Sequence, residues 1–90
     1  MSKSVKMPKR FDYSSSAEFN TALKESLNNT KLVMIDCVDM SYIDSAGIGL
    51  LVMASKQAQA HGAKLVITNL QSTPKEILQL ANLQKIIEIQ

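Results

Sequence analysis

Two short apolar runs on either side of one long helical pattern constrain this fold more than any other feature of the sequence. Leu32–Ile35 and Leu65–Ile67 are continuous apolar runs, which is the pattern of strands covered on both faces in a parallel sheet. Between them a helical pattern extends from about Asp44 to His61, and Gly62 supplies the left-handed residue that commonly ends a helix. A strand, a helix and a strand in this order predict a right-handed crossover, with the first strand at the centre of the sheet.

The remaining segments continue the alternation of strands and helices. Residues 5–7 and 11–13 suggest short edge strands, and residues 14–29 have the pattern of a first helix. Thr73-Pro74 opens a further short helix, and residues 86–89 have the pattern of a final strand. The sequence therefore predicts one α/β domain over residues 1–90, with a mixed, mostly parallel sheet of about four to five strands and helices packed against it.

Composition and charge exclude several classes of function. The formal net charge is +2, and its excess comes from residues 1–10, which we expect to form a mobile basic arm or an edge strand. This segment lacks interleaved aromatic residues, so we expect no direct contact with nucleic acid. No run approaches the roughly 20 apolar residues of a membrane span, so we expect no membrane insertion. Cys37 is the only cysteine, which excludes an intrachain disulfide and favours the cytoplasm and an inert, buried thiol.

Topology directs attention to Ser45. Sites in parallel α/β sheets gather beyond the carboxyl ends of the strands, and the segment after Ile35 leads to Asp44-Ser45 at a helix start. Unsatisfied backbone N–H groups and the positive end of the helix dipole would accommodate a phosphate on that serine. On physical grounds alone, an Asp-Ser pair that merely caps the helix is the favoured interpretation, because Asp and Ser are the commonest caps.

The segment from Tyr42 to Leu51, YIDSAGIGLL, resembles the signature of STAS domains in anti-sigma factor antagonists. The resemblance covers roughly residues 11–89 and is most specific in this segment. It implies a partner-switching circuit in transcription regulation and stress response. The unphosphorylated protein binds an anti-sigma factor that is also a serine kinase, and the sigma factor is released. Phosphorylation of the motif serine breaks that complex, and a phosphatase restores it.

The resemblance also implies a role for each residue of the motif. Ser45 is the expected phosphorylation site, and Asp44 is expected to orient its hydroxyl or to maintain the helix start. The expected partner surface is formed by Ala46, Gly47, Ile48, Gly49 and Leu51.

Enzymatic and metal-binding readings are weaker. A hydrolase would need a base next to Ser45, but the only histidine, His61, lies sixteen helical positions away, which is about 24 Å. The spacing of Asp36, Asp39 and Asp44 matches no calcium loop. We therefore expect no enzyme, no cofactor and no metal. We expect Met34, Met40 and Met53 to fill gaps in the core.

A different class of function remains open. A STAS accessory subunit that binds the ATPase of a membrane transporter would need no phosphorylation, and Ser45 would then be a capping or packing residue. A subunit of a larger STAS sensory assembly is a third possibility.

Overall fold

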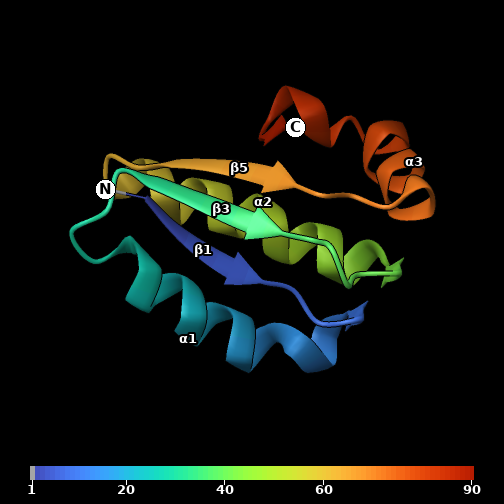
Figure 1. Cartoon of the computed structure of the whole chain (residues 1–90), viewed down its shortest axis with the longest axis horizontal. Coiled ribbons are helices and arrows are strands. Elements are labelled where there is room, and N and C mark those ends of the chain that lie inside the picture. The colour runs from blue at the N-terminus through green and yellow to red at the C-terminus, as the bar shows by residue number, and fades with distance from the viewer. Residues whose placement is uncertain (1) are drawn as a thin grey trace.

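A four-stranded sheet forms the centre of the computed structural model, which describes residues 2–90. Its strands follow the order β1-β3-β5-β6 and all three ladders are parallel (Figure 1). The strands are β1 (Ser2–Lys6), β3 (Leu32–Asp36), β5 (Lys64–Thr68) and β6 (Glu88–Ile89). The predicted α/β class and the central position of the first apolar run are confirmed. The strand pairings are all parallel, where a mixed sheet was predicted.

Within residues 2–90, three α-helices and two short 3-10 helices pack around this sheet. They are η1 (Tyr13–Ser15), α1 (Ser16–Leu27), α2 (Ser45–Ala60), α3 (Ser72–Leu80) and η2 (Leu83–Lys85). Helix α1 contacts β1 and α2, and α2 contacts β5. Figure 1 shows α2 passing behind β3 and β5, whereas α3 lies beyond the carboxyl end of β5. The core therefore lies between one face of the sheet and the pair α1 and α2.

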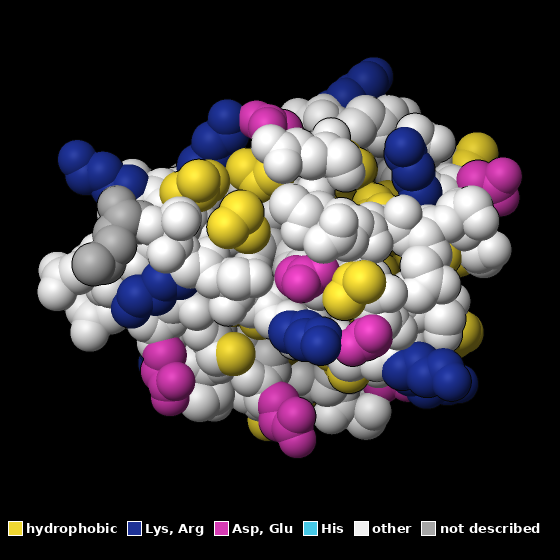
Figure 2. Space-filling model, in the orientation of Figure 1, with side chains coloured by type: hydrophobic (Ala, Val, Ile, Leu, Met, Phe, Trp, Pro, Cys, Tyr) yellow, Lys and Arg dark blue, Asp and Glu magenta, His cyan; other side chains and the backbone are white. Residues whose placement is uncertain are grey.

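Burial on both faces was expected for β3 and β5, and the structure confirms it only for β5. Leu65, Val66 and Ile67 of β5 are all buried, as predicted. In β3 the residues alternate: Val33 and Ile35 are fully buried, but Leu32, Met34 and Asp36 are only half-buried. Because α1 and α2 cover one face, the other face of β3 remains partly open. Figure 2 looks onto that face and shows hydrophobic side chains gathered over the left halves of β3 and β5.

The first residues of the chain form part of the sheet. Ser2–Lys6 make strand β1, which pairs with β3 over five residues at the edge of the sheet. The edge-strand alternative therefore describes this segment better than the mobile arm. The lysines on it suit an edge position, because charged side chains discourage pairing with another chain. The Lys6 ammonium lies 3.2 Å from the Asp39 carboxylate, which joins β1 to the loop after β3.

The methionines divide between the core and the surface. Met40 is fully buried and Met34 is half-buried, but Met53 exposes 55% of its surface, so its predicted core position is wrong. Met53 lies on α2 between Leu51 and Ala54, which face the sheet. Its own position is therefore turned away from the sheet, because successive helical residues are rotated by about 100°. The first half of this helix is apolar almost all round, so its sequence pattern did not distinguish the buried face from the exposed face.

The end of α2 confirms its sequence signals. Gly62 has a left-handed φ of 69°, and His61 Nδ1 lies 2.9 Å from the carbonyl oxygen of Gln57. The histidine thus serves the free carbonyl groups at the helix end, as expected.

Truncating Leu51 should destabilise the protein far more than truncating Met53. Leu51 is fully buried, so Leu51→Ala should lower the free energy of unfolding by about 2–5 kcal/mol. Met53→Ala removes a mostly exposed side chain of similar size from the same helix and should change it by about 0.5 kcal/mol or less. Urea denaturation of the two variants beside the unchanged protein measures both values, and equal losses would contradict the assigned helix faces.

Candidate functional site

Asp44 fixes the start of helix α2. It is the N-cap residue, with extended backbone angles, and its side-chain Oδ1 accepts a hydrogen bond of 2.9 Å from the backbone N–H of Gly47. Its carbonyl oxygen accepts a 2.9 Å bond from the N–H of Ile48. The cap is thus Asp44, and Ser45 is the exposed first residue of the helix. The serine hydroxyl is left on the surface beside the first turn, where the amides of the helix are concentrated.

A second, two-stranded sheet holds this helix start in place. Strands β2 (Arg10–Phe11) and β4 (Tyr42–Ile43) are parallel, and Phe11 pairs with Ile43. No sequence pattern indicated β4, because two residues are too few to show an alternation. A Cβ built on Gly47 would lie 2.6 Å from the Phe11 carbonyl oxygen and 2.8 Å from Ile43 Cγ1. Only glycine therefore lets β2 lie directly against the first turn of α2.

This contact is tied further into the core by an aromatic pair. The rings of Phe11 and Phe19 meet edge to face with centroids 5.0 Å apart, which joins β2 to α1. Both phenylalanines are buried. The first turn of α2 is thus supported from β2, β4 and α1 together.

The structure divides the predicted partner surface into two groups. Ala46 and Gly49 are exposed and Ile48 is half-buried, whereas Gly47 and Leu51 are buried. The prediction is therefore corrected for Gly47, which is packed under β2, and for Leu51, which is in the core. A Cβ on Gly49 would have no atom within 4 Å, so this glycine is on an open surface.

Three exposed apolar residues that the sequence did not single out for the site lie on α2 and on the segment that leads into it. Met53 continues the stripe of Ala46 and Gly49 along α2, and Tyr42 and Val38 expose 38% and 46% of their surfaces on the segment before the helix. Positions 46, 49 and 53 have helical spacing of three and then four residues, so the helical period alone could have added Met53. We call Ala46, Gly49, Met53, Tyr42 and Val38 the apolar surface.

Arg10 forms the polar border of the site and was not singled out in the sequence. Its Nε lies 2.7 Å from Asp12 Oδ2, and its Cζ lies 4.1 Å from the centre of the Tyr42 ring. The hydrogen bond to Asp12 raises the pKa of Arg10, and Tyr42, Asp12 and Asp44 act in the same direction. The pKa of Asp12 is lowered, first by its hydrogen bond from Ser14 and then by Arg10.

The loop between β3 and β4 is held in place by residues that follow β5. The Asp36 carboxylate accepts hydrogen bonds from Asn69 Nδ2 at 3.0 Å and from the Val38 N–H at 3.1 Å, and these bonds lower its pKa. Gln71 donates a 3.0 Å bond to the Val38 carbonyl. Residues after β5 therefore fix the loop that leads to Ser45.

The other predicted chemical groups are distant from one another or unreactive. Ser45 and His61 lie at opposite ends of α2, so they form no catalytic pair. Burial raises the pKa of the Cys37 thiol to about 12, and this agrees with the expected inert thiol. Among residues 2–90 no group of three or more His, Cys, Asp or Glu could hold a metal ion. None of the helices in the described part of the chain is long and apolar enough to cross a membrane.

The parallel α/β fold, and the helix that is capped by Asp44 and begins at Ser45, agree with the family comparison. The model of the STAS domain family matches residues 4–90. The chain belongs to the STAS domain family. A STAS-domain containing protein of Pseudomonas aeruginosa is 21% identical over 85 residues, which are 94% of this chain and 84% of that protein.

Solved structures show the same fold. A putative anti-sigma factor antagonist from Thermotoga maritima has a TM-score of 0.78 at 23% identity, with 96% of this chain and 77% of that chain covered. A sulfate transporter family protein from Wolinella succinogenes has a TM-score of 0.83 at 12% identity, covering 93% and 69%. The Bacillus cell fate determinant SpoIIAA in its phosphorylated form has a TM-score of 0.69 at 13% identity, covering 97% and 80%.

Alanine at the two glycines of this STAS domain should have opposite effects. Gly47→Ala places a methyl group against the Phe11 carbonyl and should lower the free energy of unfolding by about 1–3 kcal/mol. Gly49→Ala is the matched control, because its methyl group meets open space and replaces a helical glycine. It should raise the free energy of unfolding by up to about 1 kcal/mol. Thermal denaturation compares them, and a stable Gly47→Ala protein would refute the close contact of β2 with α2.

Proposed function

We propose that this STAS domain is an anti-sigma factor antagonist. Its unphosphorylated form binds an anti-sigma factor that is also a serine kinase, and phosphorylation of Ser45 by that kinase ends the binding. A serine phosphatase returns Ser45 to its free form. The observation that carries the proposal is the position of Ser45, which is exposed on the first turn of α2 and adjoins the apolar surface.

The apolar surface gives a partner a place to bind. Ala46 and Gly49 carry almost no side chain, so a second backbone can approach α2 closely there. Met53 adds a flexible side chain that adapts to a neighbour, and Tyr42 adds a large ring. Exposed apolar groups gathered in this way are typical of protein–protein contacts, where burial of apolar area provides most of the driving force.

A phosphate on Ser45 would act directly at that contact. It adds about −1.5 to −2 charge beside Asp44, and burying that charge against an apolar partner is unfavourable. The same phosphate would lie near the free amides of the first helical turn, so the domain itself can remain folded. The phosphorylated form of SpoIIAA supports this point, since a protein of the same fold has been solved in that state.

A transporter-associated role is the second candidate. The Wolinella sulfate transporter family protein shares the fold with a TM-score of 0.83. A domain of that kind would bind the ATPase of a transporter through the same exposed part of α2, and Ser45 would be an unmodified surface residue. The two candidates therefore differ in whether binding depends on the state of Ser45.

Paired bait proteins distinguish the two candidates. Ser45→Ala and Ser45→Asp proteins are immobilised in lysate of the source organism, and retained proteins are identified by mass spectrometry. We expect the alanine form to retain a kinase-type anti-sigma factor and the aspartate form to lose it at least about tenfold, because the added charge opposes burial of the apolar surface.

Asn29→Asp is the matched charge control, because Asn29 is exposed in the turn after α1 and lines one cavity with His61, at the opposite end of α2 from Ser45. This bait should retain the anti-sigma factor as the alanine form does. Retention of the same transporter ATPase by all three baits would favour the second candidate and exclude the phosphorylation switch.

A further inference from the structure

The β2–β4 ladder brings Arg10 to the segment that leads into the proposed phosphorylation site, although the two are far apart in sequence. Ladder β2–β4 pairs Arg10 with Tyr42 and Phe11 with Ile43. Phe11 and Ile43 are buried, so their exposed neighbours Arg10 and Tyr42 point away from the core on the same side. The observed stacking of the guanidinium on the Tyr42 ring, at 4.1 Å, agrees with this arrangement.

The ladder and the short segment that follows it limit how far Arg10 can lie from Ser45. Ser45 follows Tyr42 by three residues, and an extended chain covers about 10 Å in that length. Asp44, which lies between them, is close enough to raise the pKa of Arg10. The close contact between the Phe11 carbonyl and Gly47 keeps β2 and the first turn of α2 together, so this proximity does not depend on a mobile segment.

The present partner of Arg10 is one that it can leave. Arg10 is exposed over 67% of its side chain, so water can replace its ion pair with Asp12, whose side chain is only 16% exposed. Asp12 keeps other hydrogen bonds without Arg10, because its carboxylate also accepts from the N–H and the hydroxyl of Ser14. The cap of η1 would therefore persist if the arginine turned away.

We propose that Arg10 is the residue that responds to phosphorylation of Ser45, by exchanging its ion pair with Asp12 for a bidentate hydrogen bond to the phosphate. This inference rests on the proposed function, since it requires Ser45 to be phosphorylated. Arginine is suited to the exchange because its planar guanidinium binds phosphate through two parallel N–H groups. A phosphate also carries more charge than the Asp12 carboxylate and presents three acceptor oxygens.

The exchange gives the switch a second component. When Arg10 turns to the phosphate, it leaves the Tyr42 ring, which is part of the apolar surface. The partner then meets a rearranged border as well as a new negative charge. Phosphorylation would thus change the shape of the site and its charge together.

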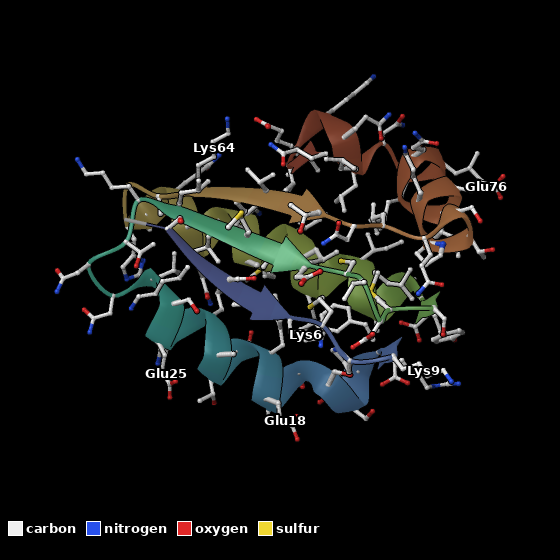
Figure 3. The ribbon with its side chains drawn as sticks, viewed as in Figure 1. Lys6, Lys9, Glu18, Glu25, Lys64 and Glu76 are labelled. Carbon is white, nitrogen blue, oxygen red and sulfur yellow. The ribbon has the colours of Figure 1, made fainter. Side chains whose placement is uncertain are left out.

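Neighbouring cations are placed less favourably than Arg10. The Lys6 ammonium lies 3.2 Å from Asp39, at the carboxyl end of β1. Lys9 is exposed at a bend directly before β2, and its ammonium is a point charge without the two parallel N–H groups that arginine offers to a phosphate. Figure 3 labels both lysines and shows Lys9 at the end of the molecule where β2 lies. Lys9 is therefore a matched control, with the same charge one residue away.

The test uses the whole protein with phosphoserine incorporated at position 45 during translation, so no kinase or partner is needed. Titration followed by phosphorus NMR gives the midpoint at which the phosphate loses its second proton. A nearby cation favours the dianion, so Arg10→Gln should move this midpoint to higher pH by about half a unit. Lys9→Gln should move it by much less. In the unchanged arginine protein, the Nε–H resonance of Arg10 should shift when Ser45 carries the phosphate.

Two outcomes would overturn the proposal. One is an equal change of the midpoint in Arg10→Gln and Lys9→Gln, which would indicate only the general charge of the segment. The other is an Nε–H resonance of Arg10 that is the same with and without phosphate, a measurement that needs no substitution and so does not depend on the stability of a variant. Because neither measurement involves an anti-sigma factor, failure here is distinct from failure of the bait experiment.

Discussion

The contact between the backbone of β2 and the first turn of α2 is the constraint on which the rest of the site depends. The Phe11 carbonyl occupies the space that a side chain at position 47 would need, so the two segments can meet only at glycine. This contact holds β2, with Arg10, against the segment from Tyr42 to Ser45, because β2 pairs with β4 and β4 leads directly into the helix. The packing of α2 against the core and the position of the exposed residues around its first turn therefore depend on the same contact.

The first turns of α2 serve two environments at once. Gly47 and Leu51 face inward, while Ser45, Ala46 and Gly49 face outward. Charge can consequently be added on the outer side without entering the core. Asp44 stabilises the same turn through its bond to the Gly47 amide, so the helix start does not rely on the serine hydroxyl. This separation allows a surface residue to be modified while the domain keeps its fold.

The sequence predicted the α/β class, the central strand and both ends of α2, because these depend on local patterns and on caps such as Asp44 and Gly62. The sequence did not predict the burial of a residue where that burial depends on which helix covers it. The run Leu32–Ile35 is apolar throughout, yet only Val33 and Ile35 lie under helices. Met53 is apolar and exposed for the same reason. The place of Arg10 could not be predicted, because it follows from β4, a two-residue strand with no sequence signal of its own.

The all-parallel sheet also determines when the protein can fold. Ser2 pairs with Leu32 and Leu32 pairs with Lys64, so each of these ladders joins residues separated by an entire helix. Such pairings close long loops before any sheet contact is gained, which slows folding compared with a helical protein of similar size. The last strand, β6, consists of Glu88–Ile89, at the far end of these 90 residues. During synthesis the sheet is thus completed only after this segment has left the ribosome.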